Sequence, residues 1–205
     1  MRSIFLRLVR YLISKIEEIE YRHLDTIPAD DLSDKIQDSY LFPETQLLIE
    51  TDTGWEPLSA LHKTRPYKHW KVKLSNGYLT ECADHHLFYT EDYKQIRVSD
   101  LYAGDKIWTD QGLVEIESCY PTEHVAEMFD TTVMSVNHRY YGDGILSSNT
   151  VLCVEFTTKM TIKLQDGSIK TTCIGDFFYS ELSKKRKLRF IEKIKWSMWK
   201  IYSKI

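Results

Sequence analysis

The chain has 205 residues, of which 42% are hydrophobic, and its formal net charge at pH 7 is −3. This length fits one domain, or one domain with an elaboration, and the hydrophobic content is sufficient for a core. Its four cysteines show no CxxC spacing and no tight Cys/His cluster, which argues against a zinc site and a disulfide framework. We therefore expect a reduced, cytoplasmic setting, no metal and no cofactor.

The N-terminal apolar segment, residues 4–13, carries Arg7 and Arg10. A signal peptide or a membrane span needs an uninterrupted apolar run, so we expect neither, and no membrane partner. Residues 1–24 as a whole have the apolar spacing of an amphipathic helix. Residues 25–44 are acidic and predict a loop-like linker.

The β patterns follow in residues 45–149 and 153–176, where short apolar alternations are separated by turn signals. Hairpins are predicted at Asn76-Gly77, Gln111-Gly112 and Asp166-Gly167. Helical spacing returns at residues 177–205, which form a basic amphipathic segment. The sequence therefore predicts a mainly β fold with amphipathic helices at both termini.

A weak internal repeat relates residues 44–61 to residues 158–178. Each segment has a β run, a glycine turn, a second short strand and an apolar start of helical character. Two related β halves favour a compact, pseudo-symmetric all-β domain.

The charge is unevenly distributed along the chain. Residues 153–205 contain twelve basic and five acidic residues, whereas residues 1–152 contain fifteen basic and twenty-five acidic ones. A basic C-terminal segment usually indicates a nucleic-acid or membrane patch, or a solvated helix face. It is equally typical of two oppositely charged pieces that associate with each other.

Three stretches of sequence carry a family resemblance. The stretch "EMFDTTVMSVNHRYYGDGILSSNT", residues 127–150, resembles the C-terminal signature of inteins, which ends in an asparagine before Ser, Thr or Cys. "NGYLTECADHHLFYT", residues 76–90, is similar to the intein motif that places a histidine nine residues after a hairpin glycine. "CVEFTTKMTIKLQDGS", residues 153–168, resembles an intein N-terminus, with Thr158 five residues after Cys153.

Two positions depart from the family pattern. Ser148 stands where the penultimate histidine is usual, which removes one helper of asparagine cyclisation, and Ala83 stands where the second motif has threonine. The spacing from the hairpin glycine selects His86 as the motif histidine, and His85 is the alternative. The other histidines, His23, His62, His69 and His124, carry no signal.

The resemblance implies a Hint fold, which is horseshoe-like, pseudo-two-fold and all β. The N-terminal signature follows the C-terminal one, so the simplest interpretation is a split intein joined in reverse order. Residues 1–149 would be the C-terminal fragment, residues 150–152 a remnant of host flank, and residues 153–205 the N-terminal fragment. Met1 and Ile205 would then be natural ends, and the opposed charges would bring the fragments together.

The resemblance also implies a single-turnover self-splicing reaction rather than turnover of an external substrate. Cys153 would form a thioester with Leu152, assisted by His86 as general acid. Thr150 would attack that thioester with Asp130 as base, and Asn149 would cyclise with help from His138. The implied partners are the complementary fragment, here in the same chain, and the flanking extein. Thr150 as the residue after the asparagine is similar to inteins of family-B DNA polymerases.

Each candidate has an ordinary structural interpretation, since a lone cysteine is usually a core residue and an asparagine in a polar cluster is usually a turn residue. Two rival function classes stay open. A Hedgehog-like autoprocessing domain would cleave without ligation, but it would not need the Asn149-Thr150 junction. A nucleic-acid-binding β domain would use the basic C-terminal helix, but it would need exposed aromatic residues on its strands. We therefore expect no nucleic-acid partner.

Overall fold

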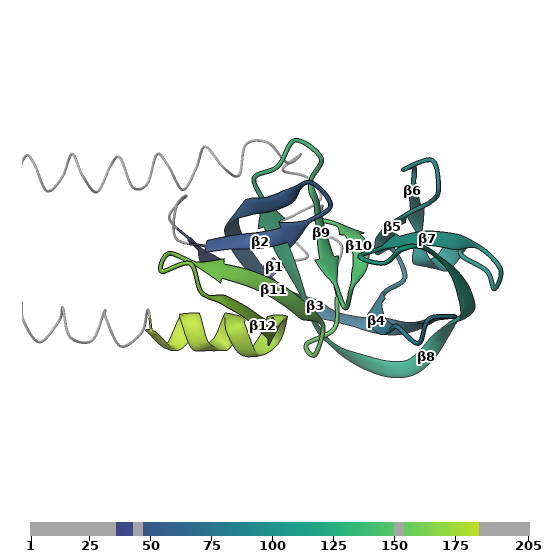
Figure 1. Cartoon of the computed structure of the whole chain (residues 1–205). Coiled ribbons are helices and arrows are strands. Elements are labelled where there is room, and N and C mark those ends of the chain that lie inside the picture. The colour runs from purple at the N-terminus through teal and green to yellow at the C-terminus, as the bar shows by residue number, and fades with distance from the viewer. Residues whose placement is uncertain (1–35, 43–46, 150–153, 185–205) are drawn as a thin grey trace, which may run out of the picture. The chain divides into compact units, whose positions relative to one another are not determined.

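The computed structural model describes residues 36–42, 47–149 and 154–184 (Figure 1). The chain divides into two compact units, residues 1–36 and 37–205, and nearly all described residues belong to the second. The predicted helix over residues 1–24 and most of the predicted helix over 177–205 lie outside the described residues, as do Thr150 and Cys153. Within the described part of the chain, no helix is both long enough and apolar enough to span a membrane.

The described residues are mostly β, which confirms the expected fold class. Twelve strands form one sheet, and β2 to β12 pair antiparallel with one another. They are β1 (Ile36–Leu41), β2 (Leu47–Thr51), β3 (Gly54–Leu74), β4 (Leu79–Ala83), β5 (Leu87–Tyr89), β6 (Gln95–Arg97), β7 (Lys106–Thr109), β8 (Gly112–Val133), β9 (Arg139–Gly142), β10 (Ile145–Ser148), β11 (Lys159–Leu164) and β12 (Ile169–Cys173), with a 3-10 turn, η2 (Val98–Asp100).

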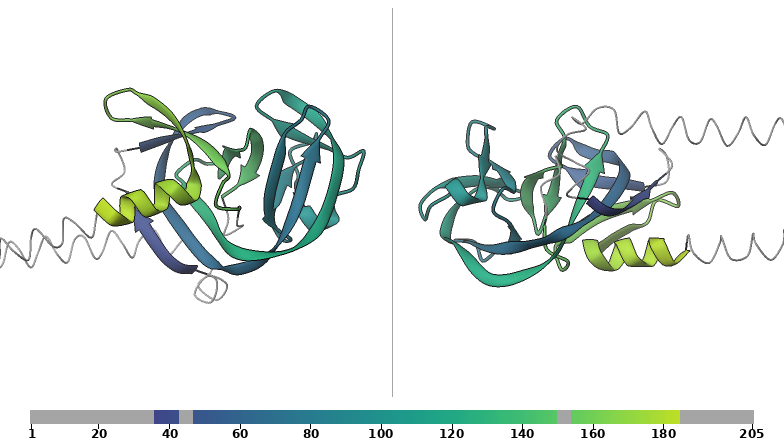
Figure 2. Two further views of the ribbon diagram at one scale, coloured as in Figure 1. Left: turned by 90° about the horizontal axis from the view of Figure 1, so that it is seen from below. Right: turned by 180° about the vertical axis from the view of Figure 1, so that it is seen from behind.

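Two long strands, β3 and β8, organise the sheet. The main path runs β12-β11-β2-β3-β8-β7-β10-β5-β6, while β1 and β4 pair with β3, and β9 pairs with β10. Figure 2 shows β3 and β8 side by side as one long, strongly curved ribbon. Their register shifts at four points, and such bulges bend a strand pair. The bent β3–β8 pair can therefore contribute to both ends of the curved sheet.

The three predicted hairpins are confirmed. Asn76-Gly77 connects β3 to β4, Gln111-Gly112 connects β7 to β8, and Asp166-Gly167 connects β11 to β12. The three glycines have φ values of 89°, 97° and 81°, a conformation that glycine adopts without steric cost. The turn residues in the sequence therefore predicted these three connections correctly.

The structure corrects two boundaries. Residues 36–41 lie within the predicted acidic linker but form strand β1, which pairs with β3. The polar residues of this segment gave no strand pattern in the sequence. In the fold, however, the Ser39 hydroxyl lies 2.8 Å from a ring nitrogen of His62. The C-terminal helix begins at residue 174, three residues earlier than predicted, and is described as far as residue 184.

The two halves of the internal repeat meet in the sheet. The β2–β3 hairpin start and the β11–β12 hairpin pair through β2 and β11, with Ile49 opposite Ile162. Both isoleucines are fully buried. The segment after residue 153 is therefore part of the same sheet and the same core as the segment before residue 149. An aromatic group packs beside this joint and comprises Phe42, Phe129, Phe156, Phe177 and Phe178.

Candidate functional site

The residue that follows Cys153, Val154, is held between two strands. It forms antiparallel bridges to Cys82 of β4 and to Phe129 of β8. The Val154 N–H donates to the Phe129 carbonyl, and the Phe129 N–H donates to the Val154 carbonyl, both at 2.8 Å. The next N–H, of Glu155, donates to the Glu81 carbonyl of β4 at 3.0 Å. The start of the N-terminal signature is thus fixed by backbone hydrogen bonds on both sides.

Asn149 follows β10 and is buried, with 5% of its surface exposed. Its backbone N–H donates to the His138 carbonyl at 3.0 Å. Its side-chain Nδ2 donates to the Val133 carbonyl, also at 3.0 Å. An ordinary surface-turn asparagine would be solvated, so this burial and the side-chain hydrogen bond distinguish Asn149 from one.

Strand β8 therefore holds a residue next to each end of the undescribed segment 150–153. Phe129 binds Val154, and Val133, four residues further along the same strand, binds the Asn149 side chain. Four residues of a strand span roughly 13 Å. A four-residue segment can bridge that distance, since an extended chain reaches about 3.3–3.6 Å per residue.

The two adjacent histidines lie in the turn after β4, not on the strand. His86 is fully buried, and its Nε2 lies 3.2 Å from the Ser147 hydroxyl of β10, two residues before Asn149. His85 is partly exposed, contacts the Asp84 carboxylate at 2.6 Å and packs against the Tyr67 ring. Of the two, His86 is the one with a described contact to β10, the strand that leads to Asn149. The turn after β4 places the two rings in different surroundings.

Asp130 is 2% exposed and lies on β8, directly after Phe129. Its Oδ1 accepts the Thr131 N–H at 2.8 Å. Its cross-strand partner on β3 is His62, a residue that carried no sequence signal. His62 is buried, which lowers its pKa to about 4, and its ring nitrogens each lie 2.8 Å from a hydroxyl, those of Ser39 and Thr132. The Asp130 carboxylate, one residue from the Val154 bridge, therefore lies across from a buried polar group, the His62 ring with its two hydroxyl partners.

His138 stands in a turn with φ of 51°, and its side chain is exposed. The structure brings its carbonyl, not its ring, to Asn149. The neighbouring Arg139 anchors this turn, because its guanidinium pairs with Asp52 at 2.7 Å and both side chains are nearly buried. Ser148, opposite Arg139 in the β9–β10 ladder, is fully buried and accepts a hydrogen bond from the Gln95 amide at 3.3 Å. The polar layer around Asn149 thus includes groups that no motif indicated.

The two remaining motif positions are both buried in packed surroundings. Thr158 is buried, and its methyl group lies 3.1 Å from where a Cβ on Gly142 would stand, so the two approach closely. Ala83 is fully buried and clusters with Met128 and Tyr67. The alanine in place of threonine therefore occupies an apolar contact in this chain.

Two of the three cysteines that the structure describes have a raised pKa. Burial raises the pKa of Cys119 to about 11, and burial also raises that of Cys173. Cys82 is fully buried at the Val154 bridge. A thiol reacts as its thiolate, so neither Cys119 nor Cys173 competes with Cys153 for that role.

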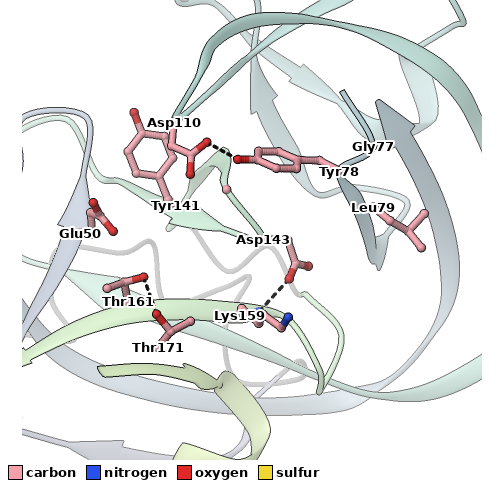
Figure 3. A pocket seen from close by; sticks show the side chains of 11 residues that line it. Glu50, Gly77, Tyr78, Leu79, Asp110, Tyr141, Asp143, Lys159, Thr161 and Thr171 are labelled. Atoms are coloured by element: carbon pink, nitrogen blue, oxygen red, sulfur yellow. Dashed lines mark hydrogen bonds between the residues drawn. The ribbon is translucent and has the colours of Figure 1, made fainter. Parts of the chain in front are cut away.

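A cavity of about 440 Å³ opens at the other end of β9 and β10 (Figure 3). It is bounded by Tyr78, whose hydroxyl donates to Asp110 at 2.8 Å, and by Asp143, which accepts the Lys159 N–H at 2.9 Å. Gly144, at the β9–β10 turn, lines it. From there to Asn149 is five residues of extended chain, roughly 17 Å. The cavity therefore lies away from Asn149, and we do not assign the splice chemistry to it.

The sequence comparisons gave no match to a family model or to a curated protein. Solved intein structures do match. The VidaL intein is 30% identical over 50% of this chain and 70% of its own, with a TM-score of 0.48. The gp41-1 intein is 22% identical over 55% of this chain and 100% of its own, with a TM-score of 0.40. A DnaB intein from Synechocystis sp. PCC 6803 is 19% identical over 53% of this chain and 82% of its own, with a TM-score of 0.46.

The identity to the VidaL intein extends over more than two thirds of that protein. The expected Hint fold is confirmed, and the intein motifs of this sequence lie together in the sheet. The chain belongs to the intein family, whose members are protein-splicing domains.

Proposed function

We propose that the chain is a split intein whose two fragments are joined here in reverse order. The two fragments splice in trans when they are separate chains. One observation carries the proposal: β8 hydrogen-bonds both Val154, beside the proposed nucleophile, and Asn149. Protein splicing requires the two ends of an intein to lie near each other, and the hydrogen bonds from β8 to Val154 and Asn149 support that arrangement. We also propose a cytoplasmic setting and a host of the family-B DNA polymerase type.

The packing of the two fragments supports this order. β11 and β12 belong to the proposed N-terminal fragment, and β11 pairs along β2 of the proposed C-terminal fragment. Residues 153–205 are strongly basic and residues 1–149 are acidic. Opposed net charge accelerates association. The shared sheet supports a fold built from both proposed fragments, and their opposed charges favour the encounter.

The first proposed step is the acyl shift. The Cys153 thiolate attacks the Leu152 carbonyl, the C–N bond of that peptide breaks, and a thioester forms while the nitrogen takes a proton. His86 is our proposed proton donor. It is buried and contacts Ser147, on the strand that leads to Asn149. A positioned general acid contributes typically about 10²–10⁴-fold in rate.

The next proposed steps use the other junction. The Thr150 hydroxyl attacks the thioester and releases the Cys153 thiol, with Asp130 as the proton acceptor. The Asn149 Nδ2 then attacks its own main-chain carbonyl, which breaks the bond to Thr150 and leaves a succinimide. Nδ2 is the atom that the Val133 carbonyl already holds. His138 is the proposed helper, since its carbonyl binds the Asn149 N–H at 3.0 Å.

Joining the fragments through residues 150–152 should block the second step. In the single chain, attack of the Thr150 hydroxyl on Leu152 would close a ring of about ten atoms that contains two planar trans amides. Such a ring is strained, so the thioester should form but transfer poorly. We expect the purified chain to keep its intact mass of 24.2 kDa under mild reducing conditions.

The test uses residues 1–150 with a C-terminal flank and residues 152–205 with an N-terminal flank, expressed separately. We expect a ligated flank product, and we expect its rate to fall steeply up to about 0.5 M salt as charges are screened. In a matched reaction, Asn149→Ala should stop release of the C-terminal flank but leave thiol-dependent cleavage before Cys153. Cys153→Ala should abolish that cleavage.

Two results would refute the proposal. If no ligated product appears at any salt concentration although the fragments bind, ligation is absent and the chain only cleaves. If thiol-dependent cleavage survives Cys153→Ala, the nucleophile is misassigned.

A further inference from the structure

We propose that His69, Glu81 and His124 form a binding site for one zinc ion, separate from the splice junctions. The three residues come from three neighbouring strands, β3, β4 and β8. One ligand atom of each lies within 4.8 Å of those of the other two. The sequence gave no signal for this site, because only the sheet brings the three residues together.

The register of the sheet explains the convergence. His69 pairs with Ala83, so Glu81 is the diagonal neighbour of His69 on the same face. On the other side, Lys68 pairs with Val125 and Trp70 with Pro121, so three residues of β8, 122–124, face one residue of β3. A bulge of this kind re-aims a side chain. It brings the His124 ring to 4.3 Å from the His69 ring, measured between centroids.

Hydrogen bonds hold the bulge in place. The Thr122 hydroxyl donates to the His69 carbonyl at 3.2 Å. The His124 N–H donates to the same hydroxyl oxygen, also at 3.2 Å. The two histidines are thus linked through one side chain in addition to the strand ladder. Preorganisation of this kind favours ligand binding, because little order has to be created on binding.

The donor groups fit zinc. The His69 Nδ1 and the Glu81 Oε2 lie 3.2 Å apart. Two ligands of a tetrahedral zinc ion with bonds of 2.0–2.1 Å lie about 3.3 Å apart, so this pair already has the required separation. Lys71 pairs with the other carboxylate oxygen, Oε1, at 3.2 Å, which leaves Oε2 directed at His69. His124 is exposed, and its ring lies against the His69 ring, next to the remaining position.

The His69 side chain is fully buried, and its Nδ1 faces the Glu81 carboxylate at 3.2 Å, so the fold already turns the proposed ligand atom toward the site. Imidazole and carboxylate donors suit zinc and the neighbouring divalent metals, and zinc sites with two histidines and one glutamate leave a fourth position for water.

The test uses the full chain with Cys153→Ala, which removes the thiol that would bind zinc at the junction. Calorimetric titration with Zn²⁺ should show one ion per chain, and zinc should raise the melting temperature because it binds the folded state. His124→Ala should weaken Zn²⁺ binding by at least about tenfold, since even outer-shell partners change metal affinity by 10–100-fold. His124 is exposed, so this variant should fold.

The matched control is Glu117→Gln, which removes a carboxylate of β8 that pairs with Lys73 at 2.6 Å, outside the site. Its zinc affinity should stay within about twofold of the parent. Zinc binding that His124→Ala leaves unchanged would overturn the site, as would the absence of binding in the Cys153→Ala chain. His69→Ala should abolish binding, and if that variant does not fold, the His124→Ala comparison alone decides.

Discussion

The buried His62 should make the stability of this intein depend on pH. The ring lies between β1 and β8, with its nitrogens 2.8 Å from the hydroxyls of Ser39 and Thr132. Burial lowers its pKa from 6.5 to about 4. The folded protein therefore keeps the ring neutral at pH values where the unfolded chain protonates it. The stabilising effect is present in full above pH 6.5 and is lost as the pH falls towards 4.

The size of the effect follows from the two pKa values. The complete difference between 6.5 and about 4 corresponds to about 3 kcal/mol. Between pH 7 and pH 5, linkage gives a loss of about 2 kcal/mol in the free energy of unfolding. A domain of ordinary stability has about 5–15 kcal/mol, so this one side chain should account for a visible part of acid sensitivity.

Urea unfolding at pH 7 and pH 5 measures the effect, with His62→Gln as the comparison. The variant should be less stable than the parent at pH 7, but its loss between the two pH values should be smaller by about 2 kcal/mol. Other titrating groups cancel in this difference. Equal pH slopes in the two proteins would refute the reasoning. They would mean that the Asp130 carboxylate, the cross-strand partner of His62, offsets the effect of burial.

Three further predictions concern the site and its support. His86→Ala should slow thiol-dependent cleavage before Cys153 by about 10²–10⁴-fold. His85→Ala should change this rate by less than about tenfold, provided that circular dichroism shows both variants folded. The reverse ranking would reassign the general acid. Gly175→Ala should destabilise the protein by about 1–3 kcal/mol in urea unfolding, because the new Cβ would stand 2.1 Å from the Phe156 ring, and a smaller side chain at 156 should relieve the clash. Arg139→Met should destabilise by about 3 kcal/mol, since it leaves a nearly buried carboxylate of the β2–β3 turn unpaired, and neutralising that carboxylate should restore part of the loss.

Local signals predicted the parts of this fold that local chemistry determines. The three hairpin turns were identified from an Asn-Gly, a Gln-Gly and an Asp-Gly pair, whose glycines take the positive φ that such turns need. Strand β1 was missed, because the hydroxyl of its polar residue Ser39 contacts His62, which lies on the distant strand β3. Periodicity reports the face that a segment buries, and it cannot report hydrogen-bond partners from distant strands.

The candidate site shows the same division. Motif spacing placed His86, Asp130 and Asn149 among its members, and the structure finds all three buried. It did not indicate Val133 or Phe129, which hold the junctions through their backbone atoms. A backbone carbonyl is common to every residue type, so no sequence pattern can mark it. The exposure of the His138 ring could not be predicted from motif spacing either, because a left-handed turn conformation determines where the ring points.

Counting residues along the sequence predicts which residues face each other only while the pairing register of the strands stays regular. Within β3–β4 each residue pairs in step, so a count from Gly77 remains correct as far as β4 extends. Along β3–β8 the pairing slips at four points, and each slip changes which residues of β8 face β3. The slip after Lys68 is the one that sets His124 against His69. The same slips bend β8, whose far end hydrogen-bonds both Val154 and Asn149. The bulges of one strand pair thus underlie both the splice junctions and the proposed zinc site, and the two can be tested separately because they share no side chain.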